Sequence, residues 1–173
     1  MKTKTENLCT LARELNLSGI AATADHLLMD AQQQQSSYLD FALKLFNSEI
    51  EHRNSQNLLK RLKSAKLPDG NDLDNWQYNR QNGISKVQLA QLRECVWLDQ
   101  NFNIILMGPS GTGKTFIAAG LCMEAVKKGY KAMFRTMDQL NYILKMKDIT
   151  KSAASEHNAL LKANLVAIDD IMM

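Results

Sequence analysis

The stretch of the chain that most constrains its fold runs from Gly108 to Thr115 and has the spacing Gly-x4-Gly-Lys-Thr of a P-loop. The octet consists of Gly108, Pro109, Ser110, Gly111, Thr112, Gly113, Lys114 and Thr115. Four apolar residues at 104–107 precede it and predict a buried strand, and the apolar periodicity of 115–128 predicts a helix. A strand, a glycine-rich turn and a helix in this order surround an anion with backbone N–H groups and the positive end of a helix dipole.

This order of elements predicts a site for the phosphates of a nucleoside triphosphate. We expect Lys114 to reach the β- and γ-phosphates and to serve catalysis, and the Thr115 hydroxyl to hold Mg²⁺. The alternative is a glycine-rich turn that only connects a strand to a helix. The apolar run before the octet and the helical pattern after it favour the nucleotide site.

Composition sets the class of molecule. A chain of 173 residues with 45% hydrophobic and 23% charged residues is typical of a globular protein, and it is long enough for one compact domain plus a small helical one. It contains no run of 18 apolar residues and no signal-peptide core, so we expect a cytoplasmic protein without a membrane segment. Cys9, Cys95 and Cys122 lack C-x-x-C spacing and predict reduced, mostly buried thiols. The formal net charge of +3 permits contact with nucleic acid without requiring it.

Helical periodicity dominates the first part of the chain. It predicts helices over 6–16 and 20–31, and a third helix from a capping box at Ser37 to about Lys66. The first half of the third helix carries an apolar stripe typical of a face packed in its own bundle. The stripe consists of Leu39, Ala42, Leu43, Phe46 and Ile50. The following turns are polar, so we expect this helix to leave the bundle towards solvent or a partner.

The end of this third helix is basic. From 53 to 66 the chain has five basic residues and no acidic one, namely Arg53, Lys60, Arg61, Lys63 and Lys66. Phosphate backbones are a natural ligand for such a face. The alternative is a solvated helix end, where the helix dipole favours basic residues.

A turn cluster at 68–72 is the best domain boundary in the chain. It separates a helical domain at 1–68 from a linker and helix at 69–100 and a nucleotide-binding core at 101–173. Trp76 and Tyr78 lie in the linker, where they either stack on a base or, as we favour, dock the linker onto the next domain. Ser85 predicts the start of a helix. Its apolar positions are Val87, Leu89, Leu92, Val96 and Trp97.

Two further strands are expected after the P-loop helix. Residues 131–135 predict one strand, a helix begins at Asp138, and 165–168 predict a third strand that ends in Asp169 and Asp170. This alternation is typical of a parallel sheet, so the expected fold class is an α/β core of P-loop type preceded by an all-α domain. An acid at the carboxyl end of a buried strand is what a Walker B element requires. We expect Asp169 to orient Mg²⁺ and Asp170 to polarise the attacking water as general base, the alternative being a plain strand end.

With these elements placed, the chain resembles the IstB-like helper ATPases of bacterial insertion sequences, relatives of the DnaC helicase loader within the AAA+ group. The resemblance is carried by 37–41, 49–53, 83–84, the octet and 165–170. It implies ATP and Mg²⁺ as cofactors, double-stranded DNA and a transposase as partners, and a homo-oligomer for the full-length protein. It also makes Arg53, Lys60, Arg61 and Lys63 expected contacts to the DNA backbone, which carry no base specificity.

The chain departs from the pattern of that family at two points. It has Asp169-Asp170 where most members have Asp-Glu, and it ends at Met173 where they continue with two strands, a sensor residue and an arginine finger. We therefore expect residues 101–173 to be the N-terminal part of an AAA+ core that binds nucleotide weakly and does not turn over ATP alone. Whether the chain is an enzyme stays open. The alternatives are a DnaC-like helicase loader, a DNA- or partner-binding module without hydrolysis and, disfavoured by the basic helix, a small-molecule P-loop kinase.

Overall fold

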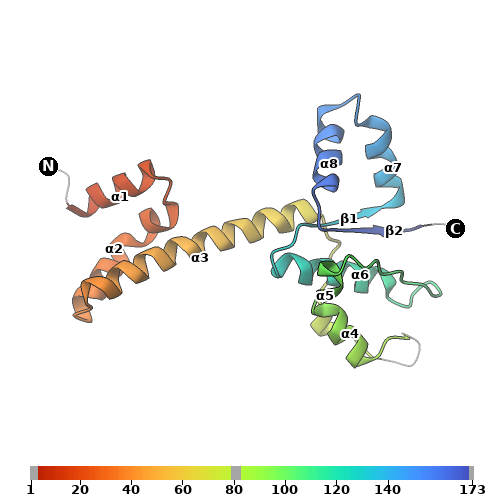
Figure 1. The fold of residues 1–173 in the computed structure, drawn as a ribbon, viewed down its shortest axis with the longest axis horizontal. Helices are drawn as coiled ribbons and strands as arrows, with labels where there is room; N and C mark the ends of the chain where they lie inside the picture. Colours follow the sequence, from red (N-terminus) through yellow and green to blue (C-terminus); the bar gives the residue numbers. More distant parts are fainter. Residues whose placement is uncertain (1–3, 79–82, 172–173) are drawn as a thin grey trace. The chain divides into compact units, whose positions relative to one another are not determined.

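The computed structural model describes residues 4–78 and 83–171, which belong to two compact units, Met1–Leu59 and Lys60–Met173 (Figure 1). The division falls within the long helix α3 (Tyr38–Ala65), ahead of the turn at 68–72. The assignment of DNA-binding, linker and core roles to 1–68, 69–100 and 101–173 stays a prediction. None of the helices in the described ranges combines the length and the hydrophobicity needed to cross a membrane.

The first unit consists of helices α1 (Lys4–Glu14), α2 (Ser18–Gln33) and the first part of α3 (Figure 1). Apolar periodicity therefore located all three helices to within a few residues. The core of this unit is small and joins all three. Its buried residues are Cys9, Ala12, Ile20 and Ala24, against which Leu8, Leu17, Ala21 and Leu45 pack.

Helix α2 approaches α3 closely at Gly19, because a Cβ atom there would lie 2.6 Å from Cβ of His52 and 2.9 Å from Cα of Glu49. The residue before α2, Leu17, offers no side-chain cap. The buried carboxylate of Glu49 replaces that cap, since its Oε2 accepts a hydrogen bond from the N–H of Ile20 at 3.1 Å. A side chain of α3 thus stabilises the first turn of α2.

The predicted inward stripe of α3 is wrong. Leu39, Leu43, Phe46 and Ile50 are between 54% and 69% exposed. The face that packs on α1 and α2 instead carries Leu45 and the buried Glu49. Periodicity favoured the apolar face, but the close approach at Gly19 and the capping contact select the neighbouring face.

The second unit is built around helix α6 (Lys114–Lys127). On it pack a single 3₁₀ turn, η1 (Leu73–Asn75), and helix α4 (Lys86–Arg93), which begins with a capping box between Ser85 and Gln88. The buried residues of this core are Leu73, Leu89, Ile117 and Leu121. Half-buried residues from the linker, α4, the segment before the P-loop and α6 itself complete it, namely Trp76, Ile84, Leu92, Ile104, Leu106 and Phe116.

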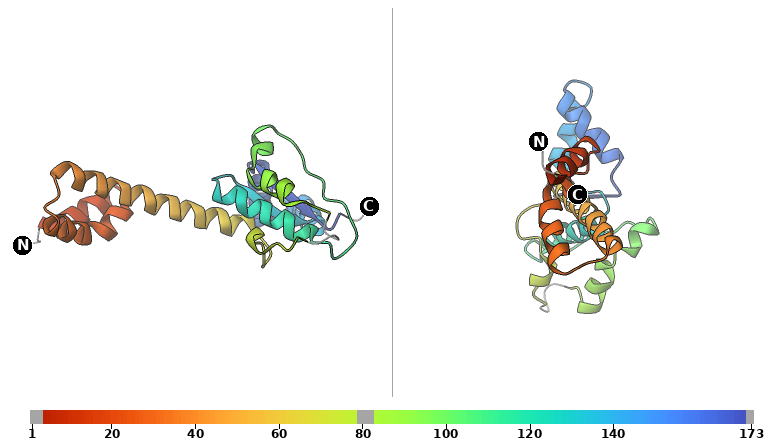
Figure 2. Two further views of the ribbon diagram at one scale, coloured as in Figure 1. Left: turned by 90° about the horizontal axis from the view of Figure 1, so that it is seen from below. Right: turned by 90° about the vertical axis from the view of Figure 1, so that its left-hand side faces the viewer.

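Strands β1 (Ala132–Thr136) and β2 (Leu165–Asp169) pair in parallel, with Ala132 opposite Leu165 and Thr136 opposite Asp169. Helix α6 lies on one side of this sheet, and α7 (Met137–Met146) and α8 (Lys151–Leu161) lie on the other (Figures 1 and 2). Parallel strands need such crossover helices, and covering both faces makes the arrangement α/β as predicted. The helix α8 was not predicted; Thr150 caps it by accepting a hydrogen bond from the N–H of Ala153.

Two sequence expectations for this unit are wrong. Residues 104–107 do not form a strand, and in the described part of the chain the sheet contains only β1 and β2. Ile104 and Leu106 pack on the α6 core, while Ile105 and Met107 are 79% and 78% exposed. The helix expected from Ser85 through Trp97 is broken at the buried Cys95, whose φ of 60° is left-handed, and a short helix α5 (Val96–Asp99) follows.

A candidate nucleotide site at the P-loop

The P-loop closes on itself ahead of α6. Gly108, Gly111 and Gly113 have φ angles of 153°, 79° and 86°, which glycine adopts without the steric cost of a Cβ atom. Lys114 Nζ donates hydrogen bonds to the carbonyl oxygens of Gly108 at 2.9 Å and Pro109 at 2.8 Å. The ammonium group therefore lies against the glycine-rich loop, next to the first turn of α6. Loop, ammonium and helix N-terminus together are suited to a phosphate anion.

Thr115 and Asp169 meet although they are far apart in the sequence. Thr115 is in the first turn of α6, Asp169 is the last residue of β2, and the Thr115 hydroxyl donates to Asp169 Oδ2 at 2.9 Å. Asp170 follows β2 with a left-handed φ of 55° and is exposed. The packing of α6 on both strands brings the P-loop to the carboxyl edge of the sheet, where an α/β fold binds its ligands.

The residues at this edge fit Mg²⁺. A hydroxyl and a carboxylate are the hard oxygen ligands that Mg²⁺ takes, and Mg²⁺ is usually held by one or two protein groups together with substrate phosphates. Across the described residues, no group of three or more His, Cys, Asp or Glu side chains could hold a metal ion alone. A magnesium site built from the Thr115–Asp169 pair and nucleotide phosphates agrees with this donor set.

The linker reaches the P-loop through Trp76. Its ring stacks on Phe116 of α6 with centroids 5.5 Å apart and an interplanar angle of 29°. A Cβ atom on Gly113 would lie 2.6 Å from two carbons of the Trp76 ring, so the glycine makes room for the indole. Docking of the linker is thereby confirmed for Trp76. Sequence alone did not indicate that Trp76 forms a wall of the loop, because the contact depends on how η1 packs.

A protein-family model described as IstB-like ATP binding protein matches residues 10–173 of this chain. The chain belongs to the IstB-like family. Among its relatives, a Bacteroides fragilis (strain YCH46) protein named as an insertion sequence IS21-like ATP-binding protein is 41% identical over 97% of this chain and 84% of its own length. A second B. fragilis protein of that name is 43% identical, over 95% of this chain and 63% of its own length. The IS5376 ATP-binding protein of Geobacillus stearothermophilus is 26% identical over 99% of this chain and 67% of its own length.

Membership of the IstB-like ATP-binding family confirms the resemblance seen in the sequence and the α/β fold of P-loop type preceded by helices. It also gives ATP as the nucleotide that this family binds. The names of the relatives tie them to insertion sequences.

The four basic residues predicted to contact DNA have different surroundings in this IstB-like chain. Arg53 lies in the first unit, where its Nε donates to Glu49 Oε1 at 2.7 Å and its guanidinium donates to the carbonyl of Asn16 at 3.2 Å. Burial raises the pKa of Glu49, but hydrogen bonds from Arg53 and from the N–H groups of Ile20 and Gly19 outweigh it and leave the pKa below its ordinary value. Arg53 therefore also has a structural role.

Lys60, Arg61 and Lys63 belong to the part of α3 in the second unit. Lys60 and Arg61 line a groove together with residues of β1 and of the end of α8. Lys63 is exposed and lies outside this groove. Their role as DNA contacts stays a prediction.

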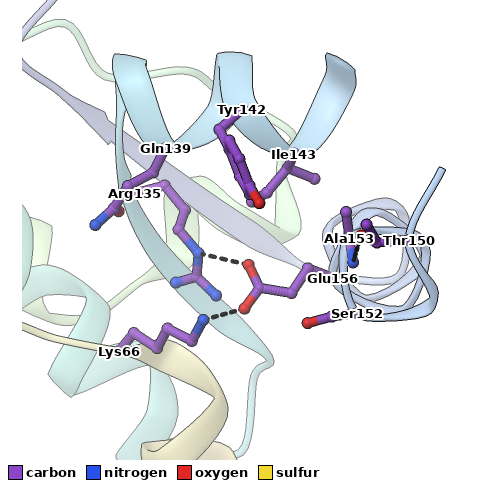
Figure 3. Close-up of a pocket in the computed structure, with 9 residues that line it drawn as sticks. All are labelled: Lys66, Arg135, Gln139, Tyr142, Ile143, Thr150, Ser152, Ala153 and Glu156. Carbon is purple, nitrogen blue, oxygen red and sulfur yellow. Dashed lines mark hydrogen bonds and ion pairs between the residues drawn. The ribbon is translucent and has the colours of Figure 1, made fainter. Parts of the chain in front are cut away.

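A separate cavity of about 260 Å³ lies between β1, α7 and α8 (Figure 3). In it, Lys66 and the buried Arg135 both point towards the carboxylate of Glu156, with which Lys66 forms an ion pair and from which Arg135 Nε lies 3.7 Å away. Arg135 also donates to the carbonyls of Phe134 and Ala65, so it joins β1 to the end of α3. Burial lowers the pKa of Arg135, and Glu156 partly offsets this. The charged groups of this cavity pair with one another, which indicates that they hold β1, α8 and the end of α3 together and do not bind a ligand.

All three cysteines of the chain are free thiols and buried, as predicted. Burial raises the pKa of Cys95, and it raises the pKa of Cys122 in α6 to about 12. Neither thiol is suited to nucleophilic chemistry at neutral pH.

Proposed function

We propose that this IstB-like protein binds ATP and Mg²⁺ at the P-loop and acts as a helper of DNA transposition, binding double-stranded DNA and directing a transposase to it. The observation that carries the proposal is the hydrogen bond between the Thr115 hydroxyl of the P-loop and the Asp169 carboxylate at the end of β2, because Mg²⁺ in P-loop proteins is held by such a pair. The insertion-sequence names of the relatives support the transposition context.

Each residue of the site has a defined task in this proposal. The N–H groups of 108–113 surround the phosphates, Lys114 neutralises the β- and γ-phosphate oxygens, and Thr115 and Asp169 hold Mg²⁺. Mg²⁺ would neutralise charge on the phosphates. Asp170 orients and polarises the attacking water as general base. It is exposed after β2, which leaves it accessible to water at that edge.

DNA binding is proposed to use the basic residues of α3, with Arg53, Lys60, Arg61 and Lys63 contacting phosphates. Such contacts fix the protein on the duplex without reading bases, which suits a protein that serves many target sequences. The second proposed partner is a transposase, which the DNA-bound protein would direct to its target.

The test of the nucleotide site is Lys114→Ala, measured by titration with a fluorescent ATP analogue in the presence of Mg²⁺. Loss of a charged hydrogen-bond donor worth about 1.5–3 kcal/mol weakens binding by roughly 10- to 150-fold. Lys127→Ala is the matched control, because it removes an ammonium from the opposite end of α6, where Lys127 pairs with Glu124. An equal loss of affinity in both variants, or none in Lys114→Ala, would contradict the assignment.

The same variants test the division into nucleotide and DNA functions. Lys114→Ala is expected to bind duplex DNA as the unaltered chain does when no nucleotide is present, and loss of that binding would refute the division. Phosphate release from ATP with and without duplex measures turnover. The expectation of weak nucleotide binding and no turnover by this chain alone is contradicted if release proceeds robustly.

Assembly is proposed to use a second copy of this chain, seated on the exposed row Leu39, Leu43, Phe46 and Ile50 of α3. The 4-3-4 spacing of this row is that of a coiled-coil seam, which a second copy of the same helix could pair with. Phe46→Asp is expected to lower the molar mass measured by light scattering towards that of a monomer, whereas Asn47→Asp, one position along, is not. An unchanged mass in Phe46→Asp excludes this row as the contact.

A further inference from the structure

A groove of about 320 Å³ in the second unit brings together basic side chains from three separate segments of the chain. Lys60 and Arg61 come from the end of α3, Lys131 directly precedes β1, and Lys162 directly follows α8. The remaining lining residues are small or apolar, such as Ser64, Ala132 and Met133. Four basic residues therefore line one groove whose lining contains no carboxylate.

The backbone positions of the two core lysines are fixed by the start of the β1–β2 ladder. The N–H of Lys131 donates to Asn164 Oδ1 at 2.9 Å, and the N–H of Asn164 donates to the carbonyl of Lys131 at 2.8 Å. Lys162 lies two residues before Asn164 and is the C-cap of α8, its N–H bonded to the carbonyls of Ala159 and Leu160. The fold thus holds both lysines beside the groove, although nothing in their local sequence pairs them.

Five other cations among the described residues of this unit are neutralised by carboxylates of the protein. The paired basic residues are Lys66, Arg93, Lys127, Lys128 and Arg135, each beside a carboxylate. Lys60, Arg61, Lys131 and Lys162 have no ion pair with any residue in the described ranges, and among those residues the buried Nε of Arg61 also has no hydrogen-bond partner. A groove lined by one sign of charge attracts an anion from outside.

We propose that this basic groove, formed by Lys60, Arg61, Lys131 and Lys162, binds the phosphate backbone of duplex DNA. This deepens and rests on the proposed DNA binding, and it adds two residues of the core, Lys131 and Lys162. The lining holds no aromatic side chain on which a base could stack, so the groove lacks the platform that single strands and free nucleotides use. Charge alone then recognises the ligand, which suits the backbone of a duplex and gives no base specificity.

The groove lies at the opposite end of the sheet from the nucleotide site. Lys131 and Asn164 directly precede the first ladder pair, Ala132 and Leu165, and Asp169 belongs to the last. At a rise of about 3.3 Å per residue, the two ends of this ladder are roughly 13 Å apart. Changes in the groove should therefore leave nucleotide binding intact, which gives the test an internal control.

The test compares the full chain carrying Lys131→Gln and Lys162→Gln with a matched control carrying Lys145→Gln and Lys151→Gln. Both double variants lose two positive charges, but Lys145 and Lys151 lie outside the groove. Binding of a short labelled duplex is followed by fluorescence anisotropy over a range of salt concentrations. Loss of two phosphate contacts should reduce the magnitude of the slope of log K against log salt by about 1.8. If the affinities of the variant and the unaltered chain are equal near 1 M salt, this change makes the variant up to roughly 60-fold weaker at about 0.1 M salt.

The groove variant is expected to show this loss of duplex affinity to the same extent for duplexes of different sequence. The control variant is expected to bind duplex as the unaltered chain does, and the groove variant is expected to bind the ATP analogue with unchanged affinity. An unchanged slope in the groove variant, while Lys63→Gln on the exposed side of α3 weakens binding, overturns the groove and leaves the proposed function standing. Loss of ATP-analogue binding in the groove variant overturns its assignment to DNA. Failure of the unaltered chain to bind duplex at any salt concentration refutes the proposed DNA function and the groove with it.

Discussion

Gly120 and Leu73 form the contact through which the linker docks on the P-loop helix. Leu73 of η1 is 2% exposed, and a Cβ atom on Gly120 of α6 would lie 2.4 Å from its Cγ and Cδ2 atoms and 3.1 Å from the carbonyl oxygen of Asn71. Separations this short require the Leu73 side chain or the η1 backbone to shift away from α6. The substitution Gly120→Ala therefore tests whether the linker is packed where the structure has it.

The magnitude for Gly120→Ala follows from two opposing effects. Overpacking a core costs about 1–3 kcal/mol, and alanine gains about 1 kcal/mol over glycine inside a helix. Gly120→Ala alone should thus lower the free energy of unfolding by up to about 2 kcal/mol. Leu73→Ala should lower it by about 2–5 kcal/mol through loss of buried surface and a cavity. In the double variant the leucine side chain is absent, so most of the overpacking cost disappears. The loss of unfolding free energy in the double variant should therefore be about 1–3 kcal/mol smaller than the sum of the losses in the two single variants.

The assay is urea unfolding followed by tryptophan fluorescence. The two tryptophans of the chain, Trp76 and Trp97, both belong to the Lys60–Met173 unit, so the signal reports the unit that contains the contact. A parallel cycle of Gly120→Ala with Leu89→Ala is the control. Leu89 is buried in the same core but is not among the atoms nearest the added Cβ. If the losses of unfolding free energy for Gly120→Ala and Leu73→Ala add to within about 0.5 kcal/mol, the contact is refuted. Equal coupling energies in the Leu73 and Leu89 cycles would refute it as well.

Three further predictions concern buried ionisable groups. Because the pKa of Glu49 is lowered on folding, its stabilisation is present above the ordinary value of 4.5 and is lost as the pH falls through the folded pKa; circular dichroism melts should show this acid loss, and Glu49→Gln should flatten it. With its pKa raised to about 12, the Cys122 thiol should react with iodoacetamide at neutral pH only after unfolding, as mass spectrometry of trapped peptides would reveal. Glu156→Gln leaves the buried Arg135 without its carboxylate and should cost about 3 kcal/mol in urea unfolding, at the low end for a buried pair because Glu156 is partly exposed.

The features that local sequence predicts well are those that local chemistry decides. The start of α4 follows from the N-cap predicted at Ser85, and the helix predicted to follow the P-loop begins at Lys114, one residue before its predicted start. The residues of β1 and β2 were predicted to within one position, because short apolar runs between helices leave few alternatives. Membership of the IstB-like family, which the comparisons bear out, likewise followed from motifs of a few residues.

The features that were missed depend on partners far along the chain. Residues 104–107 have the composition of a strand, but a strand exists only where another strand supplies hydrogen bonds, and these residues instead pack on the core of α4 and α6. The packed face of α3 was assigned to its apolar residues, although Glu49 occupies it. A buried carboxylate on that face becomes favourable only once the N-terminus of α2 and Arg53 supply its hydrogen bonds. No helical periodicity encodes such a contact.

The placement of the two proposed sites on one short ladder constrains how they can influence each other. The Thr115–Asp169 pair is at the carboxyl end of β2, and the basic groove is at its amino end, so the proposed sites for ATP and for duplex DNA share no residues. If both sites bind as proposed, both ligands could be bound at once, and any effect of one on the other would have to pass through elements that touch both ends. Strand β2 is such an element, because Asp169 ends it and Asn164, which holds Lys131, directly precedes it. A shift of β2 along α6 would move Asp169 relative to Thr115 and would move the Lys131 backbone with it. Coupling by this route changes the affinities for ATP and for DNA by the same factor, whichever ligand binds first.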